Sequence, residues 1–225
     1  MAHTTTIEYG VIGLGRFGYS LAKTLAEAGR EVLVLDNNES KIKQIRNVVE
    51  NAFVVGTLDK TTLEDAGIQN CNTVIICLAE QLDISILTTL NVISMGVPRV
   101  IAKATSYEHG LILEKIGAEV VYPESDMAVR LANKLVSSNI LDFIDLNDDI
   151  NIAELKMTSK IAGQTVAQAS LREKYDLNII AIEQGGKTIT KITPECVLNE
   201  NDKIVVVGNI CNVKKFESFL SAAYK

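Results

Sequence analysis

Short apolar runs alternate with segments of helical periodicity over the first half of the chain. Runs rich in valine, isoleucine and leucine predict strands at Ile7–Ile12, Val32–Leu35, Phe53–Val55, Val74–Cys77, Val100–Ala102 and Glu119–Val121. The segments between them predict helices at Phe17–Ala28, Ser40–Val49, Thr61–Ala66, Leu82–Ser94 and His109–Ile116. Because this alternation is typical of βαβ units, we expect an α/β fold with a doubly wound parallel sheet of the Rossmann type over residues 1–123.

The pattern changes beyond this predicted sheet. Glu124–Ile140 has the periodicity of one long amphipathic helix, and its apolar stripe contains Met127, Leu131, Leu135 and Val136. We expect no seventh strand behind it, since a polar break at 146–149 follows. Residues 124–146 are therefore predicted to form a long crossover helix and linker, which either cap the sheet or reach into another subunit to make a dimer.

Short strands and turns dominate the remaining residues, 147–225. Strands are predicted at Ile152–Met157, Asn178–Glu183, Lys187–Thr190 and Lys203–Val207, and helices at Thr165–Leu171 and Asn212–Leu220. The Gly185-Gly186 pair is a typical hairpin turn. The pattern indicates a second, smaller α+β domain, which we expect to pair with a copy of itself.

The composition of the chain excludes several classes of binding partner. The 225 residues carry a formal net charge of −6 and no tryptophan, which argues against binding to nucleic acid or to an anionic lipid surface. The longest apolar runs are far shorter than the roughly 20 residues that cross a bilayer, so we expect no direct membrane insertion. The start of the chain lacks the features of a signal peptide. The four cysteines show no C-x₂-C spacing, which favours a reducing, cytoplasmic location.

A glycine-rich motif follows the first predicted strand. It reads Gly13-Leu14-Gly15-Arg16-Phe17-Gly18 and opens the first predicted helix, and Asp36 stands at the end of the next strand. In this context the glycines allow a tight turn, close approach of backbone to phosphate, and close packing of helix on strand. The helix N-terminus attracts phosphate, and Asp36 would accept hydrogen bonds from ribose hydroxyls. The motif predicts a nucleotide site.

Arg16 lies inside this loop, beside the expected phosphate. An arginine there can contact a terminal phosphate with two hydrogen bonds, which favours ATP or ADP, while NAD(H) stays open as an alternative. The other interpretation is a solvated arginine on the first helical turn. No G-x-S-x-G, H-E-x-x-H or Walker motif occurs, and His109 has no identifiable catalytic partner. We therefore expect binding without turnover, not an enzyme; the rival hypothesis is an NAD(H)-dependent oxidoreductase.

Several runs resemble domains that regulate K⁺ conductance, the RCK or TrkA-type family, and within it the cytosolic subunits of Ktr-type potassium transporters. The resemblance covers nearly the whole chain and rests on Tyr9–Gly18, Lys103-Ala104, Leu113–Ala118, Pro123–Met127 and Asn201–Gly208. It implies homodimers built through the helix after Glu124, assembled into an octameric ring beneath an integral-membrane potassium-translocating subunit. The protein would then lie at the inner face of the cell membrane, held there by its partner, and exchange of ATP for ADP would gate transport.

The resemblance also implies roles for individual residues. Arg16 and Lys103 would meet the phosphates, Asp36 the ribose, and Glu124 a divalent cation, Mg²⁺ or Ca²⁺, held with the phosphates. The alternative for Glu124 is an acid that interacts favourably with the helix dipole. The remaining residues expected around the nucleotide are Asn37, Thr57, Ala79 and Glu80. Many relatives have Gly-Asp-Ala-Thr after the third strand where this chain has Gly56-Thr57-Leu58-Asp59, which leaves the adenosine contacts open.

A second ligand is implied for the C-terminal domain. In the Ktr branch this domain often binds cyclic di-AMP between two copies, and Arg172, Asn178, Ile179 and Pro194 stand at the matching positions. Arginine suits a phosphodiester, and isoleucine and proline suit the faces of adenine. The alternative is that Ile179 and Pro194 serve the core and a turn while Arg172 is solvated. A stand-alone cyclic di-AMP sensor without a transporter is the remaining rival hypothesis.

Overall fold

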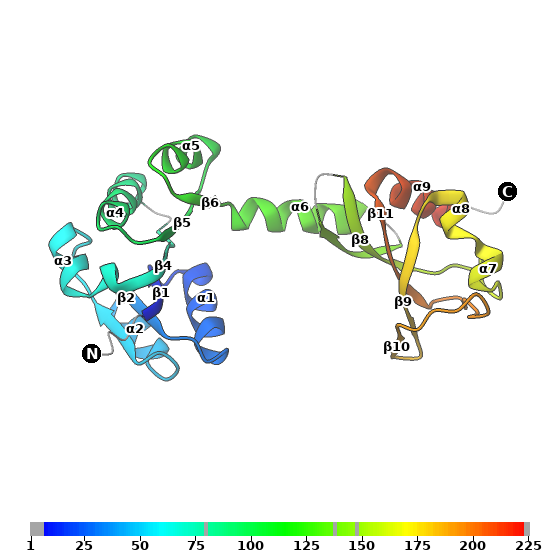
Figure 1. The fold of residues 1–225 in the computed structure, drawn as a ribbon, viewed down its shortest axis with the longest axis horizontal. Coiled ribbons are helices and arrows are strands. Elements are labelled where there is room, and N and C mark those ends of the chain that lie inside the picture. The colour runs from blue at the N-terminus through cyan, green and yellow to red at the C-terminus, as the bar shows by residue number, and fades with distance from the viewer. Residues whose placement is uncertain (1–6, 79–80, 137–138, 147–148, 223–225) are drawn as a thin grey trace. The chain divides into compact units, whose positions relative to one another are not determined.

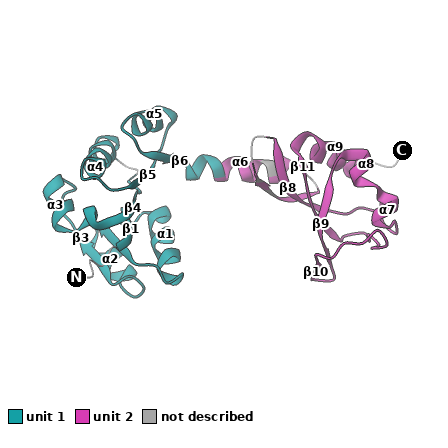
Figure 2. Ribbon diagram, in the orientation of Figure 1, with its two compact units in different colours: residues 1–126 teal, residues 127–225 magenta. Residues whose placement is uncertain are grey.

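The computed structural model describes residues 7–78, 81–136, 139–146 and 149–222. They form two compact units, residues 1–126 and 127–225 (Figure 2). Among the described residues, no helix is both long enough and apolar enough to cross a bilayer.

The first unit is a parallel sheet of six strands with helices between them (Figure 1). Its strands are β1 Ile7–Ile12, β2 Val32–Asp36, β3 Asn51–Val54, β4 Cys71–Ile76, β5 Arg99–Lys103 and β6 Glu119–Val121. Its helices are α1 Arg16–Glu27, α2 Glu39–Ile45, α3 Lys60–Asp65, α4 Leu82–Ser94 and α5 Tyr107–Lys115, with a short 3-10 turn, η1, at Ile68–Asn70. The spatial order β3-β2-β1-β4-β5-β6 is that of a doubly wound Rossmann-type sheet and confirms the predicted fold class.

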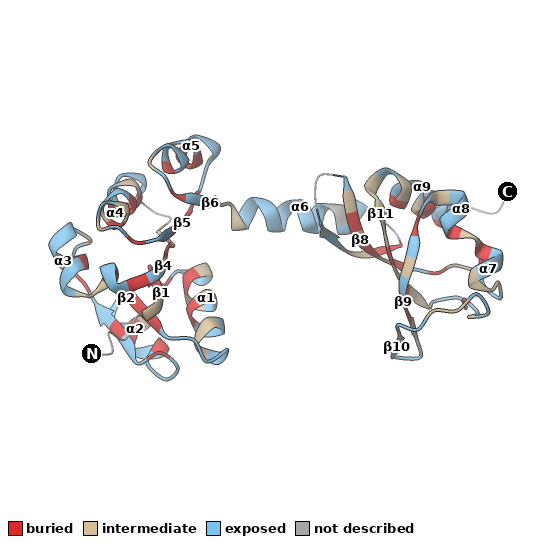
Figure 3. Cartoon of the chain, in the orientation of Figure 1, coloured by how far each residue is buried: buried red, intermediate tan, exposed pale blue. Residues whose placement is uncertain are grey.

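Both faces of this sheet are buried, because successive strand residues point to opposite sides. Ile12 and Ile76 belong to the core under α3, α4 and α5, whereas Val11 and Ile75 belong to the core under α1 and α2. This explains why the strands read as continuous apolar runs. Burial in the strands is visible as red bands in Figure 3.

Helix α6, Pro123–Val136, runs across the boundary between the two units. Its predicted apolar stripe is solvent-exposed: Met127, Leu131, Leu135 and Val136 are 53% to 85% exposed. The expected helical span to Ile140 is wrong, because α6 ends at Val136 and residues Ile140–Asp145 form a strand, β7.

The second unit is a five-stranded antiparallel sheet in the order β10-β9-β11-β8-β7. Its remaining elements are β8 Ile150–Lys156, α7 Val166–Ala169, α8 Leu171–Tyr175, β9 Asn178–Gln184, β10 Lys187–Ile189, β11 Lys203–Asn209 and α9 Ile210–Ser221. One helix was expected at Thr165–Leu171, but Ser170 adopts the left-handed conformation (φ 50°) and divides the segment into α7 and α8. A strand does follow α6, as β7, yet it pairs with β8 in this second sheet.

Candidate functional site

The glycine-rich loop closes tightly between β1 and α1. Gly13 has φ +97°, a conformation that side chains other than glycine rarely adopt. A Cβ on Gly18 would lie 2.0 Å from the carbonyl oxygen of Gly13, so only glycine lets the helix approach the strand this closely. A Cβ on Gly15 would meet nothing within 4 Å. The backbone at Gly15 is therefore open to an approaching ligand.

Asp36, the last residue of β2, ties that strand to the glycine loop. Its Oδ2 accepts the backbone N–H of Leu14, and its Oδ1 accepts the N–H of Asn38 at 2.8 Å. The Lys41 Nζ lies 3.7 Å from Oδ2, and the Asp36 side chain is only 5% exposed. The carboxylate is thus fixed in position at the carboxyl end of the sheet.

A cavity of about 280 Å³ opens beside this carboxylate. It lies at the carboxyl ends of β1, β2 and β4, where the strand order reverses, which is the usual ligand position in an open α/β sheet. The structure brings five of the predicted residues together here. They are Gly13, Gly15, Asp36, Asn37 and Thr57.

Other predicted residues lie elsewhere. Leu14 and Phe17 pack into the core under α1 and α2, and Gly18 is buried behind the loop. None of these three lines the cavity. Ala79 and Glu80, expected around the adenosine, lie outside the described residues.

Lys103, Glu124 and Arg16 form a separate charged cluster. Lys103 is 6% exposed, and its Nζ donates a hydrogen bond to Oε1 of Glu124. That hydrogen bond, with smaller contributions from the charges of Lys103 and Arg16, holds the pKa of Glu124 below its usual value. The two predicted phosphate ligands therefore both interact with the predicted metal ligand, Lys103 by a hydrogen bond and Arg16 through its charge.

This cluster fits a divalent cation poorly by itself. Mg²⁺ and Ca²⁺ need six or more oxygen ligands, and Glu124 offers one carboxylate that already serves Lys103. Among the described residues no group of three or more histidine, cysteine, aspartate or glutamate side chains could hold a metal. Glu124 also lies in the first turn of α6, as its alternative interpretation required.

The unusual Gly56-Thr57-Leu58-Asp59 segment has a clear local role. Thr57 Oγ1 donates to Oδ2 of Asp59 at 2.5 Å and lies 3.1 Å from Oγ1 of Thr62. Asp59 caps α3 by accepting the Thr62 N–H at 2.9 Å. Thr57 thus lines the cavity with its hydroxyl group already held in a hydrogen-bonded turn.

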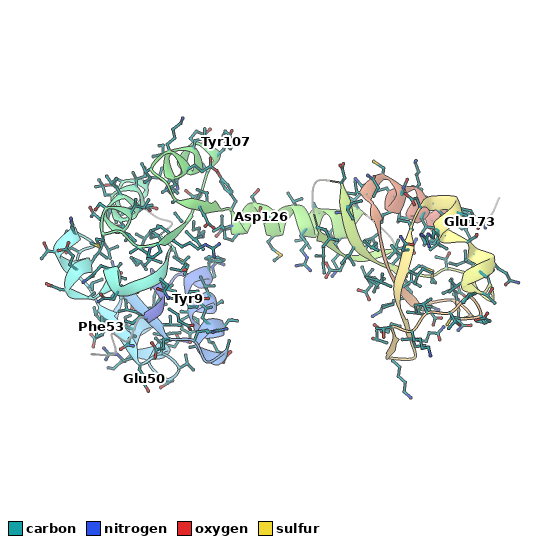
Figure 4. All side chains as sticks on the ribbon, in the orientation of Figure 1. Tyr9, Glu50, Phe53, Tyr107, Asp126 and Glu173 are labelled. Atoms are coloured by element: carbon teal, nitrogen blue, oxygen red, sulfur yellow. The ribbon has the colours of Figure 1, made fainter. Side chains whose placement is uncertain are left out.

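A second cavity, of about 490 Å³, lies in the second unit. All four residues predicted for a second ligand line it: Arg172, Asn178, Ile179 and Pro194. Its wall also contains Glu173, which lies on α8 (Figure 4) and accepts a hydrogen bond from the Ser170 hydroxyl at 2.6 Å. One cation, Arg172, one side-chain amide, Asn178, and apolar surface therefore meet in one hollow.

Catalytic groups are scarce in the first cavity. Cys77 lines it, but burial raises the pKa of its thiol to about 12, so the thiol is neutral and a poor nucleophile. Cys71 is also buried. His109 lies in α5, is 2% exposed, and is not part of the described cavity wall.

Sequence reasoning missed several residues of this wall. Lys41, Val55, Leu58, Cys77, Leu78, Gln81 and Ile84 line the cavity as well. Most of them follow β3 or β4, so the rule that ligands bind at the carboxyl ends of parallel strands could have found them. Lys41 lies in the first turn of the helix that follows Asp36 and is not part of any recognisable sequence motif, so the sequence did not indicate its position in the wall.

The fold and the first cavity define a protein of the Rossmann type with an appended α+β domain. The TrkA-N domain model matches residues 9–123, and the TrkA-C domain model matches residues 152–221. The chain therefore belongs to the TrkA-N/TrkA-C (RCK) family, as its sequence predicted.

Relatives match nearly end to end. The chain is 36% identical to Ktr system potassium uptake protein C of Bacillus subtilis, over 93% of this chain and 96% of the relative. It is also 36% identical to Ktr system potassium uptake protein A of the same organism, over 94% and 96%. Among solved structures, the GsuK channel bound to NAD aligns with all of this chain and 41% of its own, at a TM-score of 0.68 and 20% identity. That likeness establishes the fold.

Proposed function

We propose that this chain is a nucleotide-responsive regulatory subunit of a Ktr-type potassium uptake system. Its two Bacillus relatives carry that name, and their similarity extends over both domains. The observation that carries the nucleotide role is the cavity at the switch point of the sheet. Gly13, Gly15, Asp36, Asn37 and Thr57, predicted separately, line one hollow there.

ATP and ADP are the proposed ligands. The first cavity takes the nucleoside, and the exposed Gly15 backbone approaches the phosphates. The terminal phosphate then competes with the Glu124 carboxylate for Arg16 and Lys103, because both cations already interact with Glu124. Regulation requires that two states of the protein bind the third phosphate unequally. The proposed regulation does not depend on a divalent cation, because the phosphate oxygens of the nucleotide would have to supply most of the ligands of such a cation.

We infer that the chain binds without turnover. The ionisable groups of the described cavity wall are Asp36 and Lys41, which face each other, and Cys77, whose pKa is about 12. A dehydrogenase would need a proton donor or acceptor beside the nicotinamide.

Assembly through α6 is also proposed. Its stripe of Met127, Leu131, Leu135 and Val136 exposes apolar area that a second copy would bury. Dimers of this kind would form an octameric ring, which would bind an integral-membrane potassium-translocating subunit at the cytoplasmic face of the membrane.

Cyclic di-AMP is the proposed ligand of the second cavity. Arg172 supplies the cation for its phosphodiesters, and Ile179 and Pro194 supply apolar surface for its adenines. We propose this binding as part of the regulation of potassium transport. A stand-alone sensor would bind the same ligand without a membrane partner.

Thermal unfolding of the full chain tests the nucleotide assignment. ATP and ADP should each raise the unfolding temperature, because a ligand at about 100 times its Kd stabilises by about 2.7 kcal/mol. NAD and NADH should have weaker effects. A response to NAD(H) alone would contradict the proposal and favour the oxidoreductase.

Two measurements test the assembly. The particle mass should correspond to eight chains with ATP or ADP, and the protein should co-purify with a membrane potassium-translocating subunit. A monomer that binds cyclic di-AMP and no membrane protein would instead favour the stand-alone sensor.

A further inference from the structure

We propose that Lys41 is a specificity-determining residue that reads the ribose of the bound nucleotide together with Asp36. The proposal rests on the nucleotide role of the first cavity. Lys41 lies in the first turn of α2, and both residues line that cavity. The glycine-rich motif does not include Lys41 and gives it no role in nucleotide binding.

Asp36 keeps acceptor positions for a ligand. A carboxylate offers about four such positions, two on each oxygen. Oδ1 uses one for the Asn38 N–H, and Oδ2 uses one for the Leu14 N–H. One position therefore remains on each oxygen, which matches the two neighbouring hydroxyl groups of a ribose.

Lys41 does not fill these positions. Its Nζ lies 3.7 Å from Oδ2 of Asp36, beyond normal hydrogen-bond length, so the contact is an ion pair with its donors still available. The Lys41 side chain is 43% exposed, whereas that of Asp36 is 5% exposed. The ammonium group thus stands at the mouth of the cavity beside a buried acceptor.

A ribose hydroxyl that donates to Asp36 still needs a donor for its own oxygen. Lys41 is the one cation in the described cavity wall, and Thr57 already donates to Asp59. The pair therefore accepts from the sugar on one side and donates to it on the other. Lys41 also balances the charge of Asp36, which would otherwise repel a polyanionic nucleotide.

Calorimetric titration of the full chain with ADP, 2′-deoxy-ADP and 3′-deoxy-ADP tests this assignment. The variants are Lys41→Met, Lys41→Arg and the control Lys43→Met, which changes an exposed lysine of the same helix. Lys41→Met should weaken ADP binding about tenfold, the range expected for one charged hydrogen bond. Lys41→Arg should recover part of that loss, and Lys43→Met should bind like the unaltered chain.

The deoxynucleotides separate sugar recognition from charge. Removing the hydroxyl that Lys41 contacts should weaken binding to the unaltered chain, and Lys41→Met should then add little to that loss. Equal weakening of all three ligands by Lys41→Met would overturn the proposal, because charge alone would explain it. Unchanged ADP binding by Lys41→Met would overturn it as well. Failure of the unaltered chain to bind ADP or ATP would overturn the nucleotide role itself.

Discussion

The two cavities are built from different parts of a protein. The first lies at the carboxyl ends of parallel strands, where glycines and the Asp36 carboxylate hold the loop beside it in shape. The second is formed by residues from α7, α8, the start of β9 and the loop segment 192–194. Arg172, the one cationic residue in the described wall, lies on a five-residue helix flanked by left-handed Ser170 and Asp176 (φ 50° and 54°).

This contrast shows that two ligand sites in one chain can depend on different forces. The first should fail when an added atom disturbs the backbone. The second should fail when α8 loses the aromatic packing that holds it, since Tyr175 of α8 contacts Phe216 of α9 with ring centroids 5.0 Å apart. Substitutions in the two units separate these two dependences.

Phe216→Ala should have the largest effect. The ring is fully buried, and truncating a buried phenylalanine costs about 3–5 kcal/mol. Urea unfolding should show this loss, and cyclic di-AMP binding should disappear while ADP binding persists. Phe219→Ala is the matched control: its ring also contacts Tyr175 but is 39% exposed, so the loss should be about 1 kcal/mol. Normal cyclic di-AMP binding by Phe216→Ala would show that this aromatic packing does not hold α8 in place.

Gly18→Ala should come next and should act on the first cavity alone. The new methyl group would lie 2.0 Å from the Gly13 carbonyl oxygen, and such overpacking costs about 3 kcal/mol. Gly15→Ala should cost less than about 1 kcal/mol, because its methyl group meets nothing within 4 Å. Both variants should weaken ADP binding, as calorimetry would show. Normal ADP binding by Gly15→Ala would mean that the nucleotide does not approach this backbone.

The first cavity was the more predictable one. Gly13, Gly15 and Asp36 follow from a motif whose spacing encodes backbone geometry, so one sequence is enough to place them. Lys41 and Cys77 were missed because their position depends on which strands are neighbours, and β1 lies between β2 and β4 only in the folded sheet. The residues of the second cavity came from family resemblance, since no local motif joins Arg172 to Pro194.

The fold shows the same division. The parallel sheet was predicted almost element by element, because apolar runs and helical segments alternate clearly. Strand β7 was missed because Ile140–Asp145 continues the apolar pattern of α6 without a glycine or proline between them. Its pairing with β8 is a tertiary contact, which local periodicity does not encode.

Arg172→Ala should weaken cyclic di-AMP binding without affecting ADP. Loss of a charged hydrogen bond to phosphate costs about 2 kcal/mol, or about thirtyfold in Kd. Arg172→Lys should lose part of this, because lysine keeps the charge but not the planar fork. Lys215→Ala, which removes an exposed cation from α9, is the control and should bind normally. Unchanged affinity in Arg172→Ala would support the interpretation of Arg172 as a solvated residue.

The pH dependence of stability should differ between the two units, and this is the smallest effect. Burial lowers the pKa of His109 below its usual value of 6.5, and its Nε2 has no hydrogen-bond partner among the residues that the structure describes. Above pH 6.5 the stability of the first unit is fully present. As pH falls below 6.5, the unfolded chain takes up a proton at this histidine before the folded chain does, and the first unit therefore loses stability. The second unit contains no histidine.

Hydrogen-exchange mass spectrometry in urea, analysed for each unit and corrected for intrinsic exchange, should therefore show the first unit opening more readily as pH falls below 6.5. His109→Gln should remove this dependence, because glutamine does not titrate. Carboxylates such as Glu124, whose pKa is lowered by Lys103, change stability only below their usual pKa of 4.5. They therefore do not contribute to the change in stability just below pH 6.5. A parallel loss in the second unit would show that His109 is not the group responsible.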